Sequence, residues 1–358
     1  MGAGRRTFKR MGRVLLGELS VRDYETGALS ILILAPKGAG KSTLLATLAL
    51  QNLELGDLVI WRGRGRDFWP RMMRIAPIKV FVHVNDELKV WRIKPGTIEA
   101  EDITGEIDFI KYSSIQDLYP KLVDGAINVI YEPTYHQPSE ELKNLIEKEV
   151  EWLEGRFWWF DFFIQLAKRR DGRFASIFID EIDDIMPGGA SGILWKALEG
   201  IQHSLAEFRE KLVYLFGTTH DTGHVDPRLL KKFDGFFYLR GARAPEKQTM
   251  MRHKNAPARL DLGQAIIEIR GRGYGIIEFE KISHDGFLYA IEKTWIGEKV
   301  RLRGTTFRDE LMEIVETEGL EKALERLKEA KESGEISIPY YYRLKKELEG
   351  RGNGEASI

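Results

Sequence analysis

The fold is decided by one stretch of sequence, SILILAPKGAGKS at positions 30–42. Its opening run, residues 30–34, is mostly apolar and predicts a strand buried on both faces, as in a parallel sheet. A helix is expected from Lys41 to about Leu53. Glycines between such a strand and helix let backbone N–H groups turn toward a phosphate, which the helix dipole also attracts. The stretch therefore predicts a site for the phosphates of a nucleotide.

The loop matches the phosphate-binding motif G-x-x-x-x-G-K-[ST] at every position but the first, where Ala35 stands in place of glycine. We expect Ala35 to be tolerated, because that position needs only a small side chain and a negative φ angle. Lys41 is predicted to neutralise the β- and γ-phosphates, and the Ser42 hydroxyl to reach Mg²⁺. The expected cofactors are therefore ATP and Mg²⁺. The residues expected to hold the nucleotide are Pro36, Lys37, Gly38, Ala39, Gly40, Lys41, Ser42 and Thr43.

A second buried strand, residues 176–179, ends in two acids. Ligands of α/β sheets lie beyond the carboxyl ends of the strands, so Asp180 is expected to hold the Mg²⁺ together with Ser42. Glu181 is expected to orient or deprotonate an attacking water. A kinase that transfers phosphate to another substrate does not need the second acid, so the pair favours a hydrolase. The alternative is a strand that ends in solvated acids.

A third buried strand, residues 212–216, delivers polar residues to its carboxyl end. Thr219 and His220 are expected to lie near the γ-phosphate and to contribute to catalysis. The alternative is an ordinary polar loop after a core strand.

Strand patterns alternate with helical patterns along the chain, which predicts an α/β fold with a mainly parallel sheet flanked by helices. A long helix is expected over residues 139–170. Residues 265–270, 274–280 and 287–294 predict a short antiparallel meander, and residues 306–348 predict helices rich in Glu and Lys. The expected regions are a basic N-terminal segment (1–27), a nucleotide-binding domain (28–300) with an insertion at about 85–170, a helical region (301–350) and a disordered tail (351–358).

The composition excludes several classes of protein. Lys and Arg total 54 against 55 Asp and Glu, for a net charge of -1, so nucleic acid would have to be bound by local basic patches. The absence of cysteine excludes thiolate metal sites and cysteine catalysis and fits a cytoplasmic protein. Many charges without cysteine also fit a thermophile. No apolar run is long enough for a membrane span, so no integral membrane segment is expected.

Two loops combine arginine with glycine, as loops that contact DNA phosphates do. The candidate DNA contacts are Arg62, Arg64, Arg66, Arg270 and Arg272. Solvated loops or salt bridges between subunits are the alternatives. The aromatic run at 157–164 is too dense for one amphipathic stripe and predicts a core and subunit-contact helix, with a membrane-surface contact as the alternative.

The order of these parts over residues 28–245 resembles the FtsK–HerA superfamily of P-loop ATPases, which pump DNA through hexameric rings. The resemblance rests on the phosphate-binding loop, on Asp180-Glu181 and on residues 208–240. It implies a RecA-like core and a polar sensor at Thr219 or His220. It also implies an arginine finger at Arg209, shortly before the sensor. The chain departs from the family at Ala35, at the sensor, which is often Gln in the family, and in the long interval between the two nucleotide motifs.

The resemblance implies an ATP-hydrolysing ring motor, a hexamer of this chain, that translocates double-stranded DNA. Genome packaging, plasmid transfer and cellular DNA pumping remain open, and an archaeal virus or plasmid is an expected source. The alternatives are an ATPase for protein export or for virion assembly at a membrane, a nucleotide-binding scaffold with little turnover, and a small-molecule kinase. Glu181 argues against the scaffold, because binding alone does not need a second acid.

Overall fold

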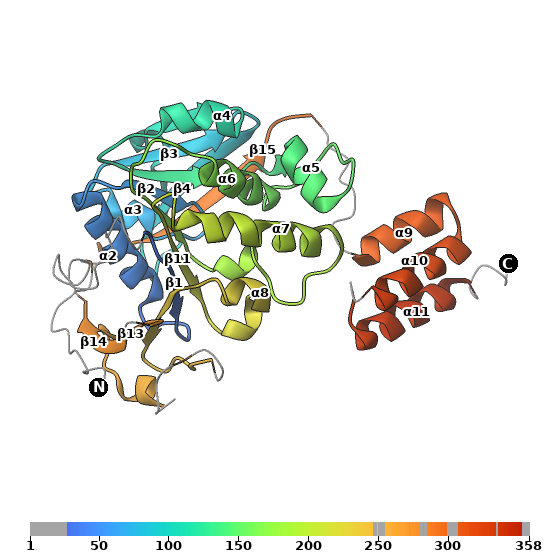
Figure 1. The fold of residues 1–358 in the computed structure, drawn as a ribbon. Coiled ribbons are helices and arrows are strands. Elements are labelled where there is room, and N and C mark those ends of the chain that lie inside the picture. The colour runs from blue at the N-terminus through green and yellow to red at the C-terminus, as the bar shows by residue number, and fades with distance from the viewer. Residues whose placement is uncertain are drawn as a thin grey trace.

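The computed structural model describes residues 27–245, 249, 255–271, 273–279, 282, 285–298, 307–333 and 336–352. Its centre is a ten-stranded sheet in the order β14-β13-β12-β1-β11-β10-β2-β7-β3-β6 (Figure 1). The strands are β1 (Ser30–Leu34), β2 (Leu58–Arg62), β3 (Ile78–His83), β6 (Phe109–Tyr112), β7 (Ile127–Tyr131), β10 (Ala175–Ile179), β11 (Val213–Thr219), β12 (Gly235–Leu239), β13 (Gln264–Ile269) and β14 (Gly273–Glu278). The predicted basic N-terminal segment (1–27) and the predicted disordered tail (351–358) lie almost wholly outside the described residues.

The strands from β12 to β6 in that order run parallel, and only β13 and β14 are antiparallel to their neighbours. Strands β1, β2, β7, β10 and β12 are buried at every residue, which explains why their sequences are mostly apolar. The phosphate-binding loop follows β1, and β11 separates β1 from the acidic strand β10. The predicted α/β fold with a mainly parallel sheet flanked by helices is confirmed.

Helices cover both faces of the sheet (Figure 1). Side chains of successive strand residues point to opposite faces, so Ile31 and Ile33 pack with α2 (Lys41–Glu54), whereas Leu32 and Leu34 join the core formed by α6 (Phe157–Ala167) and α7 (Gly192–Phe208). Three shorter helices are α3 (Trp69–Met72), α4 (Ile115–Leu118) and α8 (Pro227–Leu230).

The aromatic run at 157–164 forms most of α6 and is a core element. Each of its residues is buried, including Trp158, Trp159 and Phe163. The rings pack on one another, with Trp158 stacked on Phe162 at 4.9 Å between centroids. Because the rest of the chain covers these rings, they are not free for the alternative contact with a membrane surface.

The prediction of one long helix over residues 139–170 is wrong. The segment divides into α5 (Glu140–Ile146), the short strand β9 (Leu153–Glu154), which pairs with β8 (Tyr135–His136), and α6. Helix α5 ends where Glu147 takes a left-handed conformation with φ of 53°. The helical periodicity of the side chains did not reveal this break, because Glu is rarely found in that conformation.

The predicted place of the third strand in the antiparallel meander is also wrong. Strands β13 and β14 do pair, but β15 (Leu288–Trp295) joins a separate sheet in the order β15-β4-β5, with β4 (Asp86–Ile93) and β5 (Ala100–Asp102). The predicted insertion at about 85–170 therefore shares a sheet with a strand from the far end of the domain. Strand β6 and helix α4 lie in this region and were not predicted.

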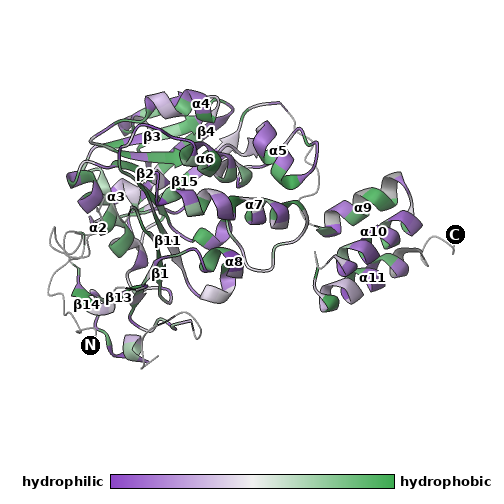
Figure 2. Cartoon of the chain, viewed as in Figure 1, coloured by the Kyte–Doolittle hydropathy of each residue, from purple (hydrophilic) through white to green (hydrophobic). Residues whose placement is uncertain are grey.

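The C-terminal helices α9 (Phe307–Thr317), α10 (Leu320–Glu332) and α11 (Ile338–Gly352) pack on a small core of their own, which includes Leu311, Leu327 and Leu344. Hydrophobic and hydrophilic residues alternate around these helices (Figure 2). Helix α10 begins after Gly319. The domain boundary near residue 300 stays a prediction. In the part of the chain that the structure describes, no helix is long and apolar enough to cross a membrane.

The close approach of two chain segments at Gly155 gives a test of this packing. A Cβ atom at Gly155 would lie 1.9 Å from the carbonyl oxygen of Pro133, a backbone atom that cannot rotate away. We expect Gly155→Ala to lower the free energy of unfolding by about 2–3 kcal/mol, because the backbone has to move apart. Urea unfolding measures the change. Gly105→Ala is the control, since a Cβ there meets nothing within 4 Å. Equal midpoints for the two variants would contradict the packing described.

Candidate nucleotide site

The phosphate-binding loop connects β1 to α2 through two glycines with positive φ, 82° at Gly38 and 95° at Gly40. Other residues rarely adopt this conformation, which turns the backbone N–H groups of the loop to one side. Gly40 is also the residue that caps α2, so the amino end of this helix faces the loop. The predicted loop geometry is therefore present from Ala35 to Ser42.

Lys41 lies inside this loop with 8% of its surface exposed. Its ammonium group donates a hydrogen bond to the carbonyl oxygen of Ala35 at 2.8 Å and lies 2.9 Å from Nδ1 of His220. Burial lowers the pKa of Lys41, an effect that the charges of Asp180 and Glu181 oppose. The side chain is thus held at the mouth of the loop, where a nucleotide phosphate would complete its hydrogen bonds.

Asp180, which directly follows β10, connects the phosphate-binding loop to β11. The Ser42 hydroxyl donates to one of its carboxylate oxygens at 2.9 Å, and the Thr218 hydroxyl donates to the other at 2.5 Å. The backbone N–H of Glu181 in turn donates to the Thr218 hydroxyl at 2.9 Å. The structure therefore brings together Ser42 and Asp180, which were predicted, and Thr218, which was not.

The oxygen atoms of Ser42 and Asp180 fit the Mg²⁺ that the motif implies. Mg²⁺ in nucleotide sites is bound by one or two protein carboxylates and hydroxyls together with the phosphates of the substrate and water. Among the described residues there is no group of three or more His, Cys, Asp or Glu that could hold a metal by itself. A hydroxyl and a carboxylate beside a phosphate-binding loop are the donors expected of a metal that arrives with its nucleotide.

Thr219 and His220 have different positions, although they are neighbours in the sequence. The Thr219 hydroxyl is buried and donates to the carbonyl oxygen of Asp221 at 3.1 Å, away from Asp180. His220 does reach the site, since its Nε2 lies 3.8 Å from a carboxylate oxygen of Glu181 and its Nδ1 contacts Lys41. Side chains of adjacent strand residues point to opposite faces, so Thr218 and not Thr219 meets Asp180. A catalytic role for Thr219 has no support in these contacts.

Glu181 follows Asp180 in a left-handed conformation, with φ of 51°. Its carboxylate accepts a hydrogen bond from Arg64 at 2.5 Å, and 36% of its side chain is exposed. The bond from Arg64 lowers the pKa of Glu181, whereas burial acts in the opposite direction. The predicted base is thus charged and held by a cation in this structure.

The arginines of the first predicted DNA loop are the partners of acids around the site. Arg62 is buried and contacts Glu132 at 2.8 Å and Asp184 at 3.4 Å. Arg64 contacts Asp184 at 3.0 Å in addition to Glu181. Direct DNA contact by Arg62 conflicts with this burial, because the buried guanidinium is already neutralised within the chain. Its arginine–glycine setting did not reveal the acids, which come from distant parts of the sequence.

The remaining predicted DNA contacts are distributed differently. Arg66 is exposed and has no ion-pair or hydrogen-bond partner among the described residues. Arg270 donates to the carbonyl oxygen of Lys231 at 2.9 Å and lies 5.3 Å from the ring centroid of Phe236. Arg272 lies outside the described residues.

Asp67 and Glu132 were missed by the sequence analysis, although both hold the arginine loop. Asp67 accepts hydrogen bonds from Nε1 of Trp61 at 2.9 Å and from the backbone N–H of Arg64 at 2.8 Å, and burial raises its pKa to about 7. Glu132 directly follows β7, so an acid at the carboxyl end of a buried strand was a signal that the sequence offered. These two acids fix the position of Arg62 and Arg64.

Arg209 lies far from the phosphate-binding loop of its own chain. It caps the C-terminal end of α7 and contacts Asp234 at 2.5 Å, while Asp234 also accepts a hydrogen bond from the backbone N–H of Ser30. Ser30 begins β1, whereas the loop follows its other end at Leu34, about 13 Å away at 3.3 Å per residue. The structure therefore does not bring Arg209 to the other predicted site residues.

No family model matches the sequence, and neither does any curated protein. Among solved structures, the fold is similar to the genome packaging NTPase B204 from Sulfolobus turreted icosahedral virus 2, at 12% identity and a TM-score of 0.40 over 70% of this chain and 98% of that one. It is also similar to the pCW3 conjugation coupling protein TcpA, at 12% and 0.35 over 71% of this chain and 60% of that one.

A third similar structure is that of ATPases 2 and 3 of Thermomonospora curvata EccC, at 12% identity and a TM-score of 0.34, which covers 72% of this chain and 38% of that one. All three are P-loop ATPases of the FtsK–HerA type, which the sequence motifs resemble. At these identities and TM-scores the likeness carries no conclusion about what this chain binds or does.

The ion pair between Glu132 and Arg62 makes stability depend on pH. Burial alone would raise the pKa of Glu132, but the charges of Arg62 and Lys293 outweigh it and lower the pKa to about 2. A carboxyl whose pKa falls on folding stabilises the fold above its unfolded value of about 4.5, and this contribution is lost as the pH falls to about 2.

We expect Glu132→Gln to lower the free energy of unfolding by about 3 kcal/mol at pH 7, with a difference from wild type that shrinks as the pH falls from about 4.5 to about 2. Urea unfolding across this pH range measures both quantities. Glu87→Gln, at an exposed position on β4, is the matched control and should leave stability unchanged. A constant difference between wild type and Glu132→Gln at all pH values would show that the Glu132 charge is not the cause.

Proposed function

We propose that this chain is a Mg²⁺-dependent ATPase. The observation that carries the proposal is the meeting of Lys41, Ser42, Asp180 and Glu181 at the carboxyl ends of β1 and β10. The hydrogen bond between Ser42 and Asp180 joins the loop that would hold the phosphates to the strand that carries the acids. Each of these side chains has a distinct task in nucleotide hydrolysis.

Lys41 would contact the β- and γ-phosphates and neutralise part of their charge. Ser42 and Asp180 would hold the Mg²⁺, which supplies further charge neutralisation when it is bound with the nucleotide. Glu181 would orient the attacking water and accept its proton. His220 lies between Lys41 and Glu181, so it is placed to respond to the γ-phosphate.

Two substitutions separate nucleotide binding from hydrolysis. Lys41→Ala should abolish hydrolysis and weaken ATP binding, because the loop loses the cation inside it. Glu181→Gln should keep ATP binding and lower turnover by about 10²–10⁴, the usual contribution of a general base. Phosphate release and binding of a fluorescent ATP analogue measure the two effects. An unchanged rate in Glu181→Gln would remove this residue from the mechanism.

We further propose that the ATPase is a ring motor, a hexamer of this chain that translocates double-stranded DNA. The resemblance of the motifs to the FtsK–HerA superfamily supports this proposal. Exposed Arg66 and half-buried Arg64 lie on the same loop after β2, and Arg64 contacts Glu181. A DNA phosphate near this loop would compete with Glu181 for the guanidinium of Arg64. DNA binding would in this way release the catalytic carboxylate and raise turnover.

This coupling predicts the behaviour of Arg64→Gln. Without the guanidinium, Glu181 is free and its pKa rises toward the ordinary value, so hydrolysis without DNA should increase about tenfold. The stimulation of hydrolysis by double-stranded DNA should become smaller. Arg66→Gln is the matched control, since it leaves the contact with Glu181 intact and should keep the low basal rate.

Rates of ATP hydrolysis with and without DNA measure the effect. An Arg64→Gln variant with wild-type basal rate and wild-type stimulation would contradict the coupling. If DNA has no effect on the wild-type ATPase although hydrolysis depends on Lys41 and Glu181, then a motor for protein export or virion assembly becomes the better description. Absence of hydrolysis with intact ATP binding would indicate a nucleotide-binding scaffold.

Arg209 fits this proposal only as a residue that acts on a neighbouring subunit. It lies at the amino-terminal edge of the sheet, opposite the phosphate-binding loop of its own chain, and 52% of its side chain is exposed. In a ring, this edge can face the nucleotide of the next subunit, where an arginine stabilises the charge that develops on the γ-phosphate. Its contact with Asp234 would then position the guanidinium for the interface.

A further inference from the structure

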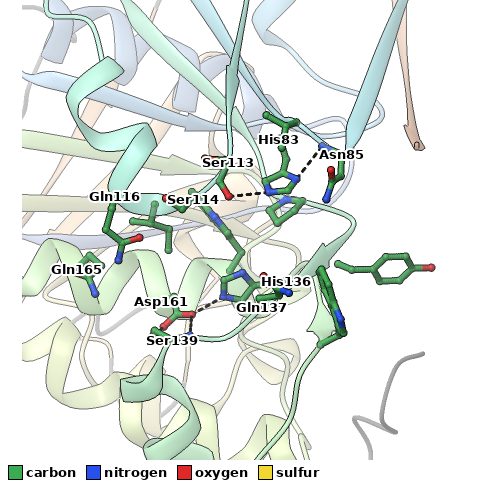
Figure 3. A pocket seen from close by; sticks show the side chains of 16 residues that line it. His83, Asn85, Ser113, Ser114, Gln116, His136, Gln137, Ser139, Asp161 and Gln165 are labelled. Atoms are coloured by element: carbon green, nitrogen blue, oxygen red, sulfur yellow. Dashed lines mark hydrogen bonds and ion pairs between the residues drawn. The ribbon is translucent and has the colours of Figure 1, made fainter. Parts of the chain in front are cut away.

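A second site lies at the same edge of the sheet as the nucleotide site but far along it. A cavity of about 300 Å³ opens where β3 and β6 end, lined by His83, Ser113 and residues of α6 (Figure 3). In the sheet order, β3 stands five places from β1, about 24 Å at a strand spacing of about 4.8 Å. The cavity is therefore separate from the phosphate-binding loop. Ligands of α/β sheets bind beyond the carboxyl ends of the strands, which is the position of this cavity.

The buried pair His136 and Asp161 forms one wall of the cavity. His136 is 8% exposed and Asp161 is 1% exposed, and Nε2 of the imidazole lies 2.5 Å from a carboxylate oxygen. Asp161 also accepts hydrogen bonds from the backbone N–H of Ser139 at 2.9 Å and from the Ser139 hydroxyl. Because a carboxylate oxygen accepts from Nε2, the imidazole proton lies on Nε2. Nδ1 of His136 is then a hydrogen-bond acceptor.

That Nδ1 atom has no partner among the residues that the structure describes, although the ring is more than nine-tenths buried. The amides of Gln116 and Gln165, which also line the cavity, likewise have no hydrogen-bond partner in the described part of the chain. Buried polar groups without partners are costly unless something else satisfies them. This applies to Nδ1 of His136, whereas the exposed amide of Gln116 and the half-buried amide of Gln165 offer further hydrogen-bonding groups to a ligand in the cavity.

The charges around the cavity exclude several classes of ligand. Among the described residues that line it there is no Lys or Arg, so a phosphate or carboxylate has no cation to bind there. His83 uses both of its nitrogens, since Nδ1 accepts from the backbone N–H of Asn85 and Nε2 donates to the carbonyl oxygen of Ser113, each at 3.2 Å. Burial also lowers the pKa of His83, so this imidazole is neutral. The one acid, Asp161, is already satisfied, which disfavours a cationic ligand.

Aromatic rings supply another part of the lining of the cavity. Trp158 is stacked on Phe162 behind the wall, while Tyr135 and Trp152 pack edge-to-face against Trp295 of β15. The second sheet thus holds the aromatic rim in place. Flat apolar surfaces beside unpaired amides suit a planar ring whose edge carries donors and acceptors.

We infer that this cavity binds an uncharged nucleobase, as a free nucleoside or as an unstacked base of a nucleic acid strand. Glutamine amides pair with the donor and acceptor atoms on base edges, and aromatic side chains stack on base faces. The volume of about 300 Å³ is at the small end of ligand pockets and suits a base or nucleoside. The inference does not depend on ATP hydrolysis, because none of the residues involved belongs to the nucleotide site.

Calorimetric titration of the full chain with adenosine and with cytidine tests the inference, in the presence of excess ADP to occupy the phosphate-binding loop. We expect binding to persist with ADP and in Lys41→Ala. The double variant Gln116→Leu/Gln165→Leu should lower the affinity about tenfold or more, through the loss of two hydrogen-bonding amides. Gln202→Leu on α7, which does not line the cavity, is the matched control and should bind as wild type does.

A single-stranded oligonucleotide in a parallel titration distinguishes the two sources of the base. If the oligonucleotide binds and loses affinity in Gln116→Leu/Gln165→Leu while nucleosides do not bind, then the base is presented by a strand. Urea unfolding midpoints of the variants establish that they are folded. The inference is overturned if neither probe binds at millimolar concentration, if ADP displaces the nucleoside, or if the double variant binds as tightly as Gln202→Leu.

Discussion

The parallel register of β1, β11 and β10 is the constraint on which the rest of the structure depends. Leu34 pairs with Thr219, so β1 and β11 end together, whereas Ile179 pairs with Gly217, so β10 ends two residues earlier and Asp180 follows beside Thr218. This alignment places the phosphate-binding loop, Thr218 and Asp180 within hydrogen-bonding distance of one another. A shift of one residue in the register of β11 would turn Thr218 away and bring Thr219 toward Asp180. The burial of every residue in these strands holds the register in place.

The charges around the site form one connected group. Arg62 and Arg64 lie between the acids that follow β7 and those that follow β10, and each arginine contacts two carboxylates. A new anion would disturb this group, because a phosphate that binds one arginine competes with the carboxylates that the arginine contacts. This links the outer loop after β2 to Glu181 through a single side chain. The same arrangement explains why Glu132 is ionised despite its surroundings.

The three-stranded sheet β15-β4-β5 positions aromatic side chains beside the cavity. By pairing with β4, β15 brings Trp295 from late in the sequence to the aromatic rim of the cavity at β3 and β6. The cavity therefore depends on a contact between two segments separated by most of the domain. The nucleotide site and the cavity share one edge of one sheet, although they are built from different strands and different kinds of side chain. Parallel sheets permit this, since each strand end offers a position for a ligand.

The sequence by itself determined the strand–loop–helix at 30–54, the acids at 180 and 181, and the α/β class, because these features depend on local backbone geometry and on apolar runs. Only the tertiary structure decided that Thr218 and not Thr219 meets Asp180, that Arg62 and Arg64 are paired with acids, and that β15 leaves the meander for β4. It also decided that His136 meets Asp161. The physical reason is that these are contacts between strand ends and loops far apart in the chain, and no local pattern records which of them come together.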